Sequence, residues 1–353
     1  MPRPLALIHA ILLSLAITGA ARAQSDQYIL KPDGTWTQAH TPEPGSDAAT
    51  IAEARKAIAD NRPDAARGIL DRWLEANERS GKPEVPEALR LRGDAHTAMN
   101  REDRGLRDYE SLIQKFPQSE EYITALEREF EIAKAYAYGK KALWFGFLRV
   151  ENGGPLAEEI FIRIQERLPG SELAERAGIE LADYYFRDRD LVMAGEMYTL
   201  YLTLYPEGPN RRKAMERRVF ASVGRFRGPQ NDVSGLLDAK EQVRIYAMQY
   251  PEEAERQGLD QALVVRLNES LAAQMLETAN WYLRRDDEPS ARLTLKRLIA
   301  RYPSTQATTR ALEIIEEYGW APKPEPAPEA PAPAERTPAP KDPEPAATPE
   351  GSN

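Results

Sequence analysis

Residues 194–206 read AGEMYTLYLTLYP, and this stretch decides the fold because the chain writes its pattern five times. A small residue is followed by an apolar residue four positions later, a second apolar residue seven positions later, and a closing apolar–Pro pair. Offsets of zero, four and seven place three side chains on one face of a helix. The stretch therefore predicts one type of helix, repeated. The prolines are Pro117, Pro169, Pro206, Pro251 and Pro303, and the small residues are Gly105, Ala157, Ala194, Ala239 and Ala291.

Each repeated helix is expected to end just before its proline, which cannot continue a helix and disfavours helical geometry at the preceding residue. A partner helix is expected upstream of each copy, and a weaker copy without a proline opens the array at Ala54 and Ala66. The chain is therefore predicted to be all-α, a right-handed solenoid of about six helix-turn-helix pairs between residues 48 and 318. The partner helices carry Gly93 and His96, Ala133 and Tyr136, Ala182 and Tyr185, Ala221 and Gly224, and Ala279 and Tyr282.

Two sets of these residues carry a family resemblance. Gly93, Tyr109 and Pro117, like Ala182, Tyr198 and Pro206, resemble a tetratricopeptide repeat (TPR) of about 34 residues. The last unit, from Ala279 through Trp281-Tyr282 and Tyr302-Pro303 to Tyr318, resembles the closing repeat of the BamD (YfiO/ComL-like) outer-membrane assembly family, and residues 131–141 are similar to its middle repeat. The resemblance implies a non-enzymatic scaffold for protein partners at the outer membrane. The chain departs from that family in having no Cys for lipidation.

Four segments are predicted. Residues 1–23 have a basic start, a short apolar stretch and the small-x-small sequence Ala21-Arg22-Ala23, which predict a cleaved export signal, with an uncleaved anchor as the alternative. Residues 24–47 are expected to form an extended leader arm with a turn, or else an unstructured leader, and residues 48–318 form the solenoid. Residues 319–353 are rich in Pro, Ala and Glu and predict a disordered tail, either a semi-stiff tether or a solubilising extension.

Composition argues against several classes of function. The formal charge of −9 disfavours nucleic-acid binding, and two local basic clusters, around residues 211–227 and 284–301, are expected to be solvated helix faces rather than a partner surface. No phosphate-binding loop or nucleophile elbow occurs, and there is no Cys nucleophile. Of three histidines, only His96 falls in the array, at a position where Tyr is usual, so it is expected to be a packing residue. We therefore expect no catalytic residue, no metal and no cofactor.

A partner is expected to bind where the first helix of each pair faces the concave surface. The family register points to side chains at fixed positions after each repeat start, and their mixed chemistry suits an extended peptide. Ordinary solvated surface is the alternative for each position. The predicted groove residues are Arg90, Asp94, Arg176, Asp183, Phe186, Leu276, Asn280, Leu283 and Arg284.

The run Leu143–Leu148 is the most apolar stretch after the signal. As a helix it would be apolar nearly all round, so it must bury against something. Internal packing is the first expectation, and a docking patch for a partner, formed by Trp144, Phe145 and Phe147, is the alternative.

The function predicted from these observations is an exported, periplasmic TPR-type scaffold, peripheral to the outer membrane, that binds extended segments of partner proteins in outer-membrane protein assembly. It is expected to contact the membrane only through a partner. The alternative is a cell-envelope adaptor that organises a complex or contacts the cell wall through its Pro-rich tail.

Overall fold

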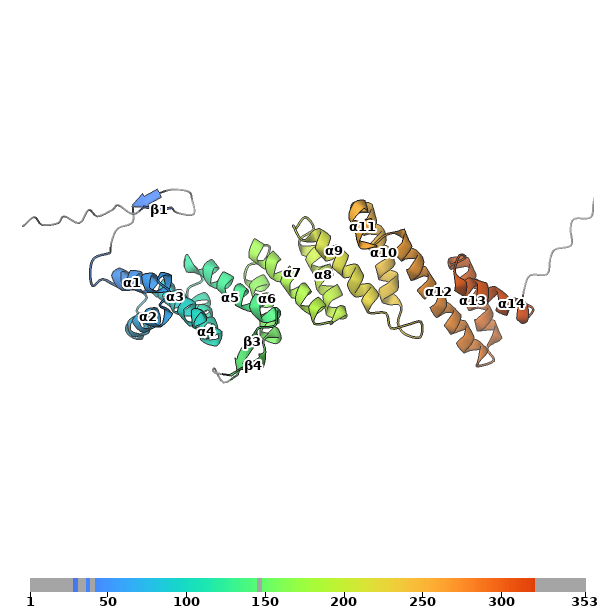
Figure 1. Ribbon diagram of the computed structural model, residues 1–353, viewed down its shortest axis with the longest axis horizontal. Helices are drawn as coiled ribbons and strands as arrows, with labels where there is room; N and C mark the ends of the chain where they lie inside the picture. Colours follow the sequence, from blue (N-terminus) through green and yellow to red (C-terminus); the bar gives the residue numbers. More distant parts are fainter. Residues whose placement is uncertain (1–27, 31–35, 39–41, 145–147, 321–353) are drawn as a thin grey trace, which may run out of the picture. The chain divides into compact units, whose positions relative to one another are not determined.

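The chain folds into helix pairs, as the computed structural model shows for the residues it describes: 28–30, 36–38, 42–144 and 148–320 (Figure 1). These residues form fourteen helices and two small antiparallel hairpins of strands, so the predicted all-α fold is confirmed. None of the described helices is long and apolar enough to cross a bilayer.

The chain divides into two compact units, which we describe separately. Unit 1 contains residues up to Asp188 together with residues 203–208. Its helices are α1 (Asp47–Ala59), α2 (Pro63–Asn77), α3 (Val85–Ala98), α4 (Glu102–Lys115), α5 (Glu121–Ala137), α6 (Gly154–Arg167) and α7 (Glu172–Arg187).

Unit 2 contains residues 189–202 and the chain from Pro209 onward. It includes most of α8 and all later helices. Their bounds are α8 (Leu191–Leu204), α9 (Arg211–Gly224), α10 (Ser234–Gln249), α11 (Pro251–Gln257), α12 (Gln261–Leu283), α13 (Glu288–Arg301) and α14 (Gln306–Glu317).

The five prolines end their helices where the sequence predicted. Helices α4, α6, α8, α10 and α13 each stop two residues before the proline. The residue in between leaves the helical region in a nearly constant way: Phe116 has φ −132° and ψ 56°, and Tyr302 has φ −134° and ψ 58°. This is the steric restriction that a proline places on its predecessor. Pro251 differs only in starting α11 directly, where a proline at the first helical position is tolerated.

The repeated apolar stripe is the core. The four alanines of the stripe are 0% exposed, and the large residues four and seven positions further on are at most 1% exposed. Gly105 is also buried, and the weaker first copy packs its predicted residues, from Ala54 to Trp73, inside the fold. The prediction of helix pairs facing each other through small residues is therefore confirmed.

The α3–α4 pair shows why a small residue is needed. A methyl group added to Gly93 would lie 2.4 Å from Cε1 of Tyr109, and one added to Gly105 would lie 2.5 Å from Oγ1 of Thr97 and 3.0 Å from the Gly93 carbonyl oxygen. The two helices thus approach until backbone and ring touch. His96, on the same pair, is 7% exposed, in keeping with the packing role expected for it.

The insertion between α5 and α6 is a hairpin of strands, so the helical form considered for this run is wrong. Strand β3 (Lys141–Trp144) pairs with β4 (Leu148–Asn152). Arg149 anchors the hairpin because its guanidinium donates to the carbonyl oxygens of Lys141 and Asn100, both at 2.8 Å. Of the predicted docking patch, Phe145 and Phe147 lie outside the described residues, as does the side chain of Trp144.

The leader contains a second hairpin. Strand β1 (Tyr28–Leu30) pairs antiparallel with β2 (Trp36–Gln38), Ile29 opposite Thr37. The expected turn at Pro32-Asp33-Gly34 lies outside the described residues, as do residues 1–23 and 321–353 of the predicted signal and tail.

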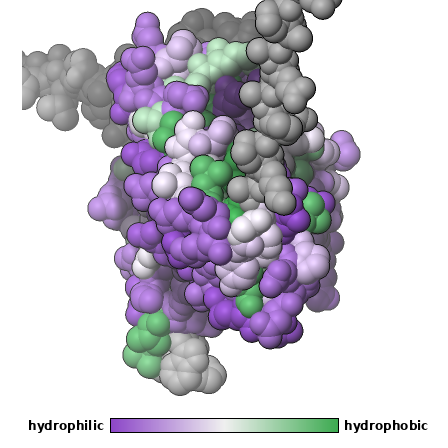
Figure 2. All heavy atoms as spheres, turned by 90° about the vertical axis from the view of Figure 1, so that its right-hand side faces the viewer, coloured by the Kyte–Doolittle hydropathy of each residue, from purple (hydrophilic) through white to green (hydrophobic). Residues whose placement is uncertain are grey.

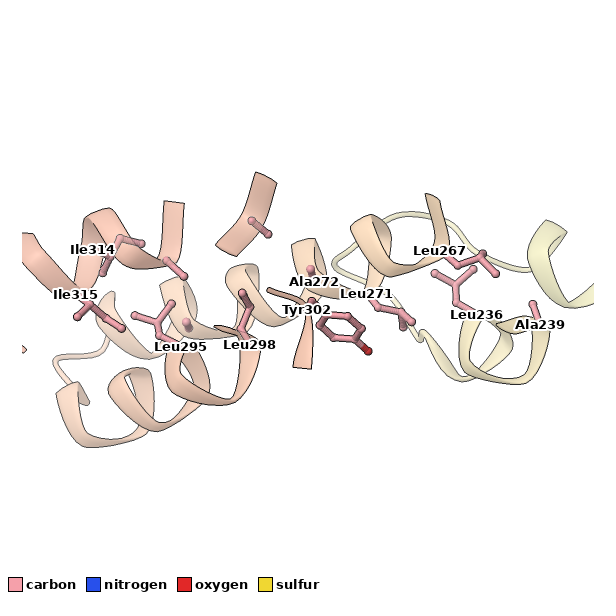
Figure 3. Close-up of a cluster of buried hydrophobic side chains, with 13 residues drawn as sticks. Leu236, Ala239, Leu267, Leu271, Ala272, Leu295, Leu298, Tyr302, Ile314 and Ile315 are labelled. Atoms are coloured by element: carbon pink, nitrogen blue, oxygen red, sulfur yellow. The ribbon is translucent and has the colours of Figure 1, made fainter. Parts of the chain in front are cut away.

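Unit 2 closes on a hydrophobic core (Figure 3). Leu295 and Leu298 of α13, Tyr302, and Ile314 and Ile315 of α14 belong to it, and α10 and α12 contribute leucines to the same cluster. Helix α14 buries only one side and exposes charged residues such as Arg310 and Glu313 on the other. A terminal helix with a polar outer face is what a repeat array needs to end in water. At this end of the chain, hydrophobic residues form small patches within a hydrophilic surface (Figure 2).

Candidate functional site

The clearest candidate for a binding site in unit 1 is an open cavity of about 360 Å³, which we call the unit-1 groove. Its apolar lining comes from Ile58 of α1 and from Ile132 and Ala135 of α5. Polar residues of α3, α4 and α5, with Lys140 just after α5, complete it, so helices distant in sequence build one surface. These polar residues are Asp94, Thr97, Glu102, Tyr109, Arg128, Glu131 and Lys140.

Asp94 is the centre of the polar side of the groove. Its carboxylate accepts hydrogen bonds from the Tyr109 hydroxyl at 2.8 Å, from Nε of Arg128 at 3.1 Å and from Nη1 of Arg90 at 2.7 Å. Arg90 also pairs with Glu121. Although burial opposes its charge, the carboxylates of Glu121 and Asp94 outweigh burial and raise the pKa of Arg90. The guanidinium therefore stays charged and fixes Asp94 in place.

Tyr109 links the core to the groove. Its ring is fully buried, while its hydroxyl reaches Asp94. Burial and the nearby Asp94 carboxylate both raise the pKa of Tyr109. The hydroxyl therefore remains protonated at physiological pH and donates to Asp94.

A second charged cluster joins the groove to the β3–β4 hairpin. Glu102 is 1% exposed and pairs with Nζ of Lys140 at 2.5 Å and Nη2 of Arg149 at 2.7 Å. Burial alone would raise the pKa of Glu102, but the Lys140 and Arg149 contacts outweigh it and hold that pKa below its usual value. The buried charge is thus compensated, and the hairpin is tied to the N-terminus of α4.

The outer rim of the groove consists of charged side chains that reach water. The side chains of Arg128 and Glu131 are 51% and 58% exposed. Arg176 of α7 approaches Glu131 at 3.4 Å and lies over the Phe130 ring, with its Cζ 4.5 Å from the ring centroid. Exposed ion pairs of this kind contribute little to stability. These charged side chains can exchange partners, so they are better suited to binding another molecule than to stabilising the fold.

Behind the groove, α5 buries a carboxylate that lacks good partners. Glu129 is 0% exposed, and neither of its oxygens makes a hydrogen bond among the described residues. The nearest cation is Nη1 of Arg167, at 3.7 Å, and that guanidinium already donates to both oxygens of Glu110, at 2.9 and 2.6 Å. Burial, together with the Glu110 carboxylate, raises the pKa of Glu129 to about 7.

The predicted groove residues of unit 1 fall at different depths. Asp94 lines the unit-1 groove, Arg90 holds Asp94, and Arg176 reaches Glu131 on the rim. Asp183 is 2% exposed and Phe186 is half-buried on α7.

The other predicted groove residues lie on α12 in unit 2. Leu276 and Leu283 are half-buried and pack against the hydrophobic core of unit 2. Asn280 is half-buried, and Arg284 is exposed and pairs with Glu277 at 3.0 Å. These four positions remain predictions for a partner surface.

The repeat register missed most of the groove. Arg128, Glu131 and Lys140 were not predicted, and Tyr109 was predicted only as a packing residue. Transferred to α5, the positions that gave Arg90 and Asp94 on α3 point to Phe130 and Lys134 instead. The sequence carried one usable signal, the closely spaced charges of Arg128 and Glu131 beside apolar Ile132.

No group of three or more His, Cys, Asp or Glu side chains that could hold a metal occurs in the part of the chain that the structure describes. What the unit-1 groove offers is an apolar floor, a fixed carboxylate and exposed charges of both signs. An arrangement of this kind suits recognition by shape and polarity.

The helix pairs have the arrangement of tetratricopeptide repeats, and residues 87–119 match a family model for that repeat. Residues 151–321 match the model of a more particular family, described as YfiO, outer membrane lipoprotein. The chain is therefore a TPR protein that resembles the BamD (YfiO-like) family. Both families mediate contacts between proteins.

The chain also matches solved structures at low sequence identity. The C-terminal part of a TPR repeat-containing protein from Cytophaga hutchinsonii is 14% identical, with 76% of this chain and 89% of that one covered and a TM-score of 0.38. PilW, a type IV pilus biogenesis factor, is 11% identical, with coverage of 75% and 97% and a TM-score of 0.29. No curated protein sequence matches the chain significantly.

Proposed function

We propose that the chain is a periplasmic scaffold that binds extended segments of partner proteins in the unit-1 groove, in the setting of outer-membrane protein assembly. The observation that carries the proposal is the groove itself, an open cavity of about 360 Å³ whose floor is apolar and whose rim is charged. An extended peptide needs small apolar pockets for its side chains and polar groups for its backbone.

The charges favour a protein over a polyanion. Asp94, Glu102 and Glu131 line the groove beside Arg128 and Lys140, so the surface has no single sign. A nucleic acid would require a basic surface, because its affinity comes mainly from phosphate contacts. The match of residues 151–321 to an outer-membrane lipoprotein family supports the envelope setting. With no Cys to carry lipid, this chain would meet the membrane through its partner.

The proposal is tested by filling the groove. Ala135→Trp places an indole over the apolar floor, and Ala65→Trp adds the same ring at an exposed position of α2 as the control. The probe is a urea-unfolded outer-membrane β-barrel protein diluted into buffer, and its capture by the purified chain is measured by fluorescence anisotropy. We expect Ala135→Trp to abolish capture and Ala65→Trp to preserve it. Equal capture by both variants, each with an unchanged circular dichroism spectrum, contradicts the proposal.

A further inference from the structure

The last described residue, Trp320, is held in a defined position by the end of α14. Gly319 has φ +66°, the amide of Trp320 donates to the Ile315 carbonyl oxygen at 2.8 Å, and that of Gly319 donates to Glu316 at 3.0 Å. These two hydrogen bonds and the left-handed glycine form a Schellman motif. The Trp320 ring packs against the core of unit 2 and lies 4.7 Å from the Tyr318 ring.

Trp320 forms one wall of a cavity of about 430 Å³ on α13, which we call the α13 pocket. Pro289 and Leu293 provide its apolar lining, and Leu293 is 50% exposed although it is a large aliphatic residue. Nη2 of Arg292 lies 3.5 Å from the carbonyl oxygen of Trp320. The described part of the chain therefore ends at the wall of the α13 pocket.

Two exposed cations, Arg292 and Lys296, flank the apolar lining, and among the described residues no carboxylate forms an ion pair with either. Glu288 is the one acidic residue of the lining, so the α13 pocket has a net positive charge. An aromatic wall beside an apolar groove recognises polyproline segments, whose extended helix is already formed before binding. The unpaired cations add a preference for acidic residues between the prolines.

The chain carries such a segment directly after Trp320. Eleven of the 33 residues from Ala321 to Asn353 are proline. Residues 324–335 read PEPAPEAPAPAE, in which Glu325, Glu329 and Glu335 are the charged residues. Only three residues separate this segment from Trp320, so its concentration at the α13 pocket is set by a very short linker.

We propose that residues 324–335 dock into the α13 pocket of their own chain, with proline rings against Trp320 and Leu293 and glutamates beside Arg292 and Lys296. The docked segment covers apolar surface at the end of unit 2. A tail of this kind acts as an intramolecular cover for the last repeat, separate from the unit-1 groove and independent of the function proposed for it.

The absence of cysteine makes a direct test possible. Ala334→Cys in the full-length chain carries a nitroxide spin label, and the readout is paramagnetic broadening of the Leu293 methyl signals by NMR. Arg292→Glu with Lys296→Glu reverses both pocket cations. Arg297→Glu, an exposed cation of α13 outside the pocket, is the matched control. The methyl signals of buried Leu295 and Leu298 report whether the variants remain folded.

We expect loss of the Leu293 methyl signals in the labelled parent chain and in Arg297→Glu, and their recovery in the double charge reversal. Broadening that is equal in all three chains would show mere proximity of the tail and overturn the proposal, as would its absence from the parent. Docking of the tail onto a second copy of the chain is tested by mixing spin-labelled chains with isotope-labelled, cysteine-free chains. Broadening in that mixture would mean that the tail docks between molecules, which also overturns docking within one chain.

Discussion

The α3–α4 pair in unit 1 and the α12–α13 pair in unit 2 follow the same repeat but are packed differently. In α3–α4 the small residues are glycines: Gly93 faces Tyr109, whose hydroxyl reaches a carboxylate, and Gly105 faces Thr97. In α12–α13 the corresponding residues are Ala279, Ala291 and Leu295, all 0% exposed, and Ala279 and Leu295 belong to a mostly aliphatic cluster that also contains Tyr302. One pair ends in the charged network of a groove, whereas unit 2 has no buried charged side chain among its described residues.

The difference between the two pairs shows that the repeat specifies the buried positions and leaves the polar positions open. The repeat fixes which positions are buried, and both pairs obey it. The polar residues between those positions are free to vary. In α3–α4 they include Arg92, which donates to both oxygens of Asp108 at 3.1 and 2.6 Å, and Asp94 with its three donors. Binding chemistry therefore lies at the positions that the repeat does not determine.

The largest effect is expected in the hydrophobic core of unit 2. Leu298 of α13 is 0% exposed, and Leu298→Ala should lower the free energy of unfolding of unit 2 by about 3 kcal/mol because it leaves a cavity that the helices only partly fill. Hydrogen exchange at α13 amides measures the loss. Leu312→Ala, at a residue that is 52% exposed, is the control. Equal protection in the two variants would show that α13 does not depend on this core.

An effect of similar size is expected at the buried carboxylate of unit 1, but there the substitution should stabilise the protein. The folded chain raises the pKa of Glu129 from the ordinary 4.5 to about 7, so it binds more protons than the unfolded chain between these values. Stability should therefore fall as pH rises from 4.5 to 7 and stay low above 7. Glu129→Gln should remove this slope and raise the free energy of unfolding at pH 8 by about 3 kcal/mol.

The charges that face Glu129 are Glu110 on α4 and Arg163 and Arg167 on α6. Hydrogen bonds from Arg167 outweigh burial and lower the pKa of Glu110, so the stability that Glu110 contributes is lost only at more acidic pH. The two windows do not overlap. Urea unfolding from pH 4 to 8 measures the slope, with exposed Glu131→Gln as the control. A slope that survives in Glu129→Gln would assign it to another group.

A smaller loss of stability is expected when the small residue of the α3–α4 pair is replaced by the alanine of the α12–α13 pair. Gly93→Ala pushes a methyl group into the Tyr109 ring and should destabilise unit 1 by about 2 kcal/mol, as overpacking does. Gly68→Ala in α2, where the same carbon meets nothing within 4 Å, should not. Adding Tyr109→Leu to Gly93→Ala reproduces the alanine–leucine combination of α12–α13 and should recover part of the loss. Thermal unfolding checks all three, and no recovery in the double variant would break the equivalence of the pairs.

The smallest effect concerns a single hydroxyl. Tyr109→Phe removes one of three donors to Asp94 and should cost about 1 kcal/mol. Tyr246 of unit 2 is equally buried, but its hydroxyl has no hydrogen-bond partner among the described residues, so Tyr246→Phe should be neutral or stabilising. Denaturant midpoints measured on the two variants provide the comparison. A greater loss for Tyr246→Phe would refute the role assigned to Asp94.

The repeat pattern was sufficient to predict the fold because proline stops and buried apolar positions are local signals. Pro117 and Pro303 end their helices because a proline restricts the backbone of the residue before it, so two adjacent residues are enough to predict the helix end. The unit-1 groove had no such signal, since Ile58 and Lys140 line one cavity only after α1, α3 and α5 pack together. The β3–β4 hairpin was missed because a short apolar run has no period that separates strand from helix. Glu129 looked like any helical glutamate, and only packing shows that it is buried.

The most direct test of the central claim, that the unit-1 groove holds an extended segment of another protein, is photo-crosslinking in cells. A photoreactive phenylalanine analogue is placed at Glu131 on the groove rim or at Arg107, whose side chain is 70% exposed on α4. The account predicts protein adducts from position 131, mapped by mass spectrometry to short continuous peptides, and none from position 107. Adducts from position 107 alone, or equal adducts from both positions, would contradict it.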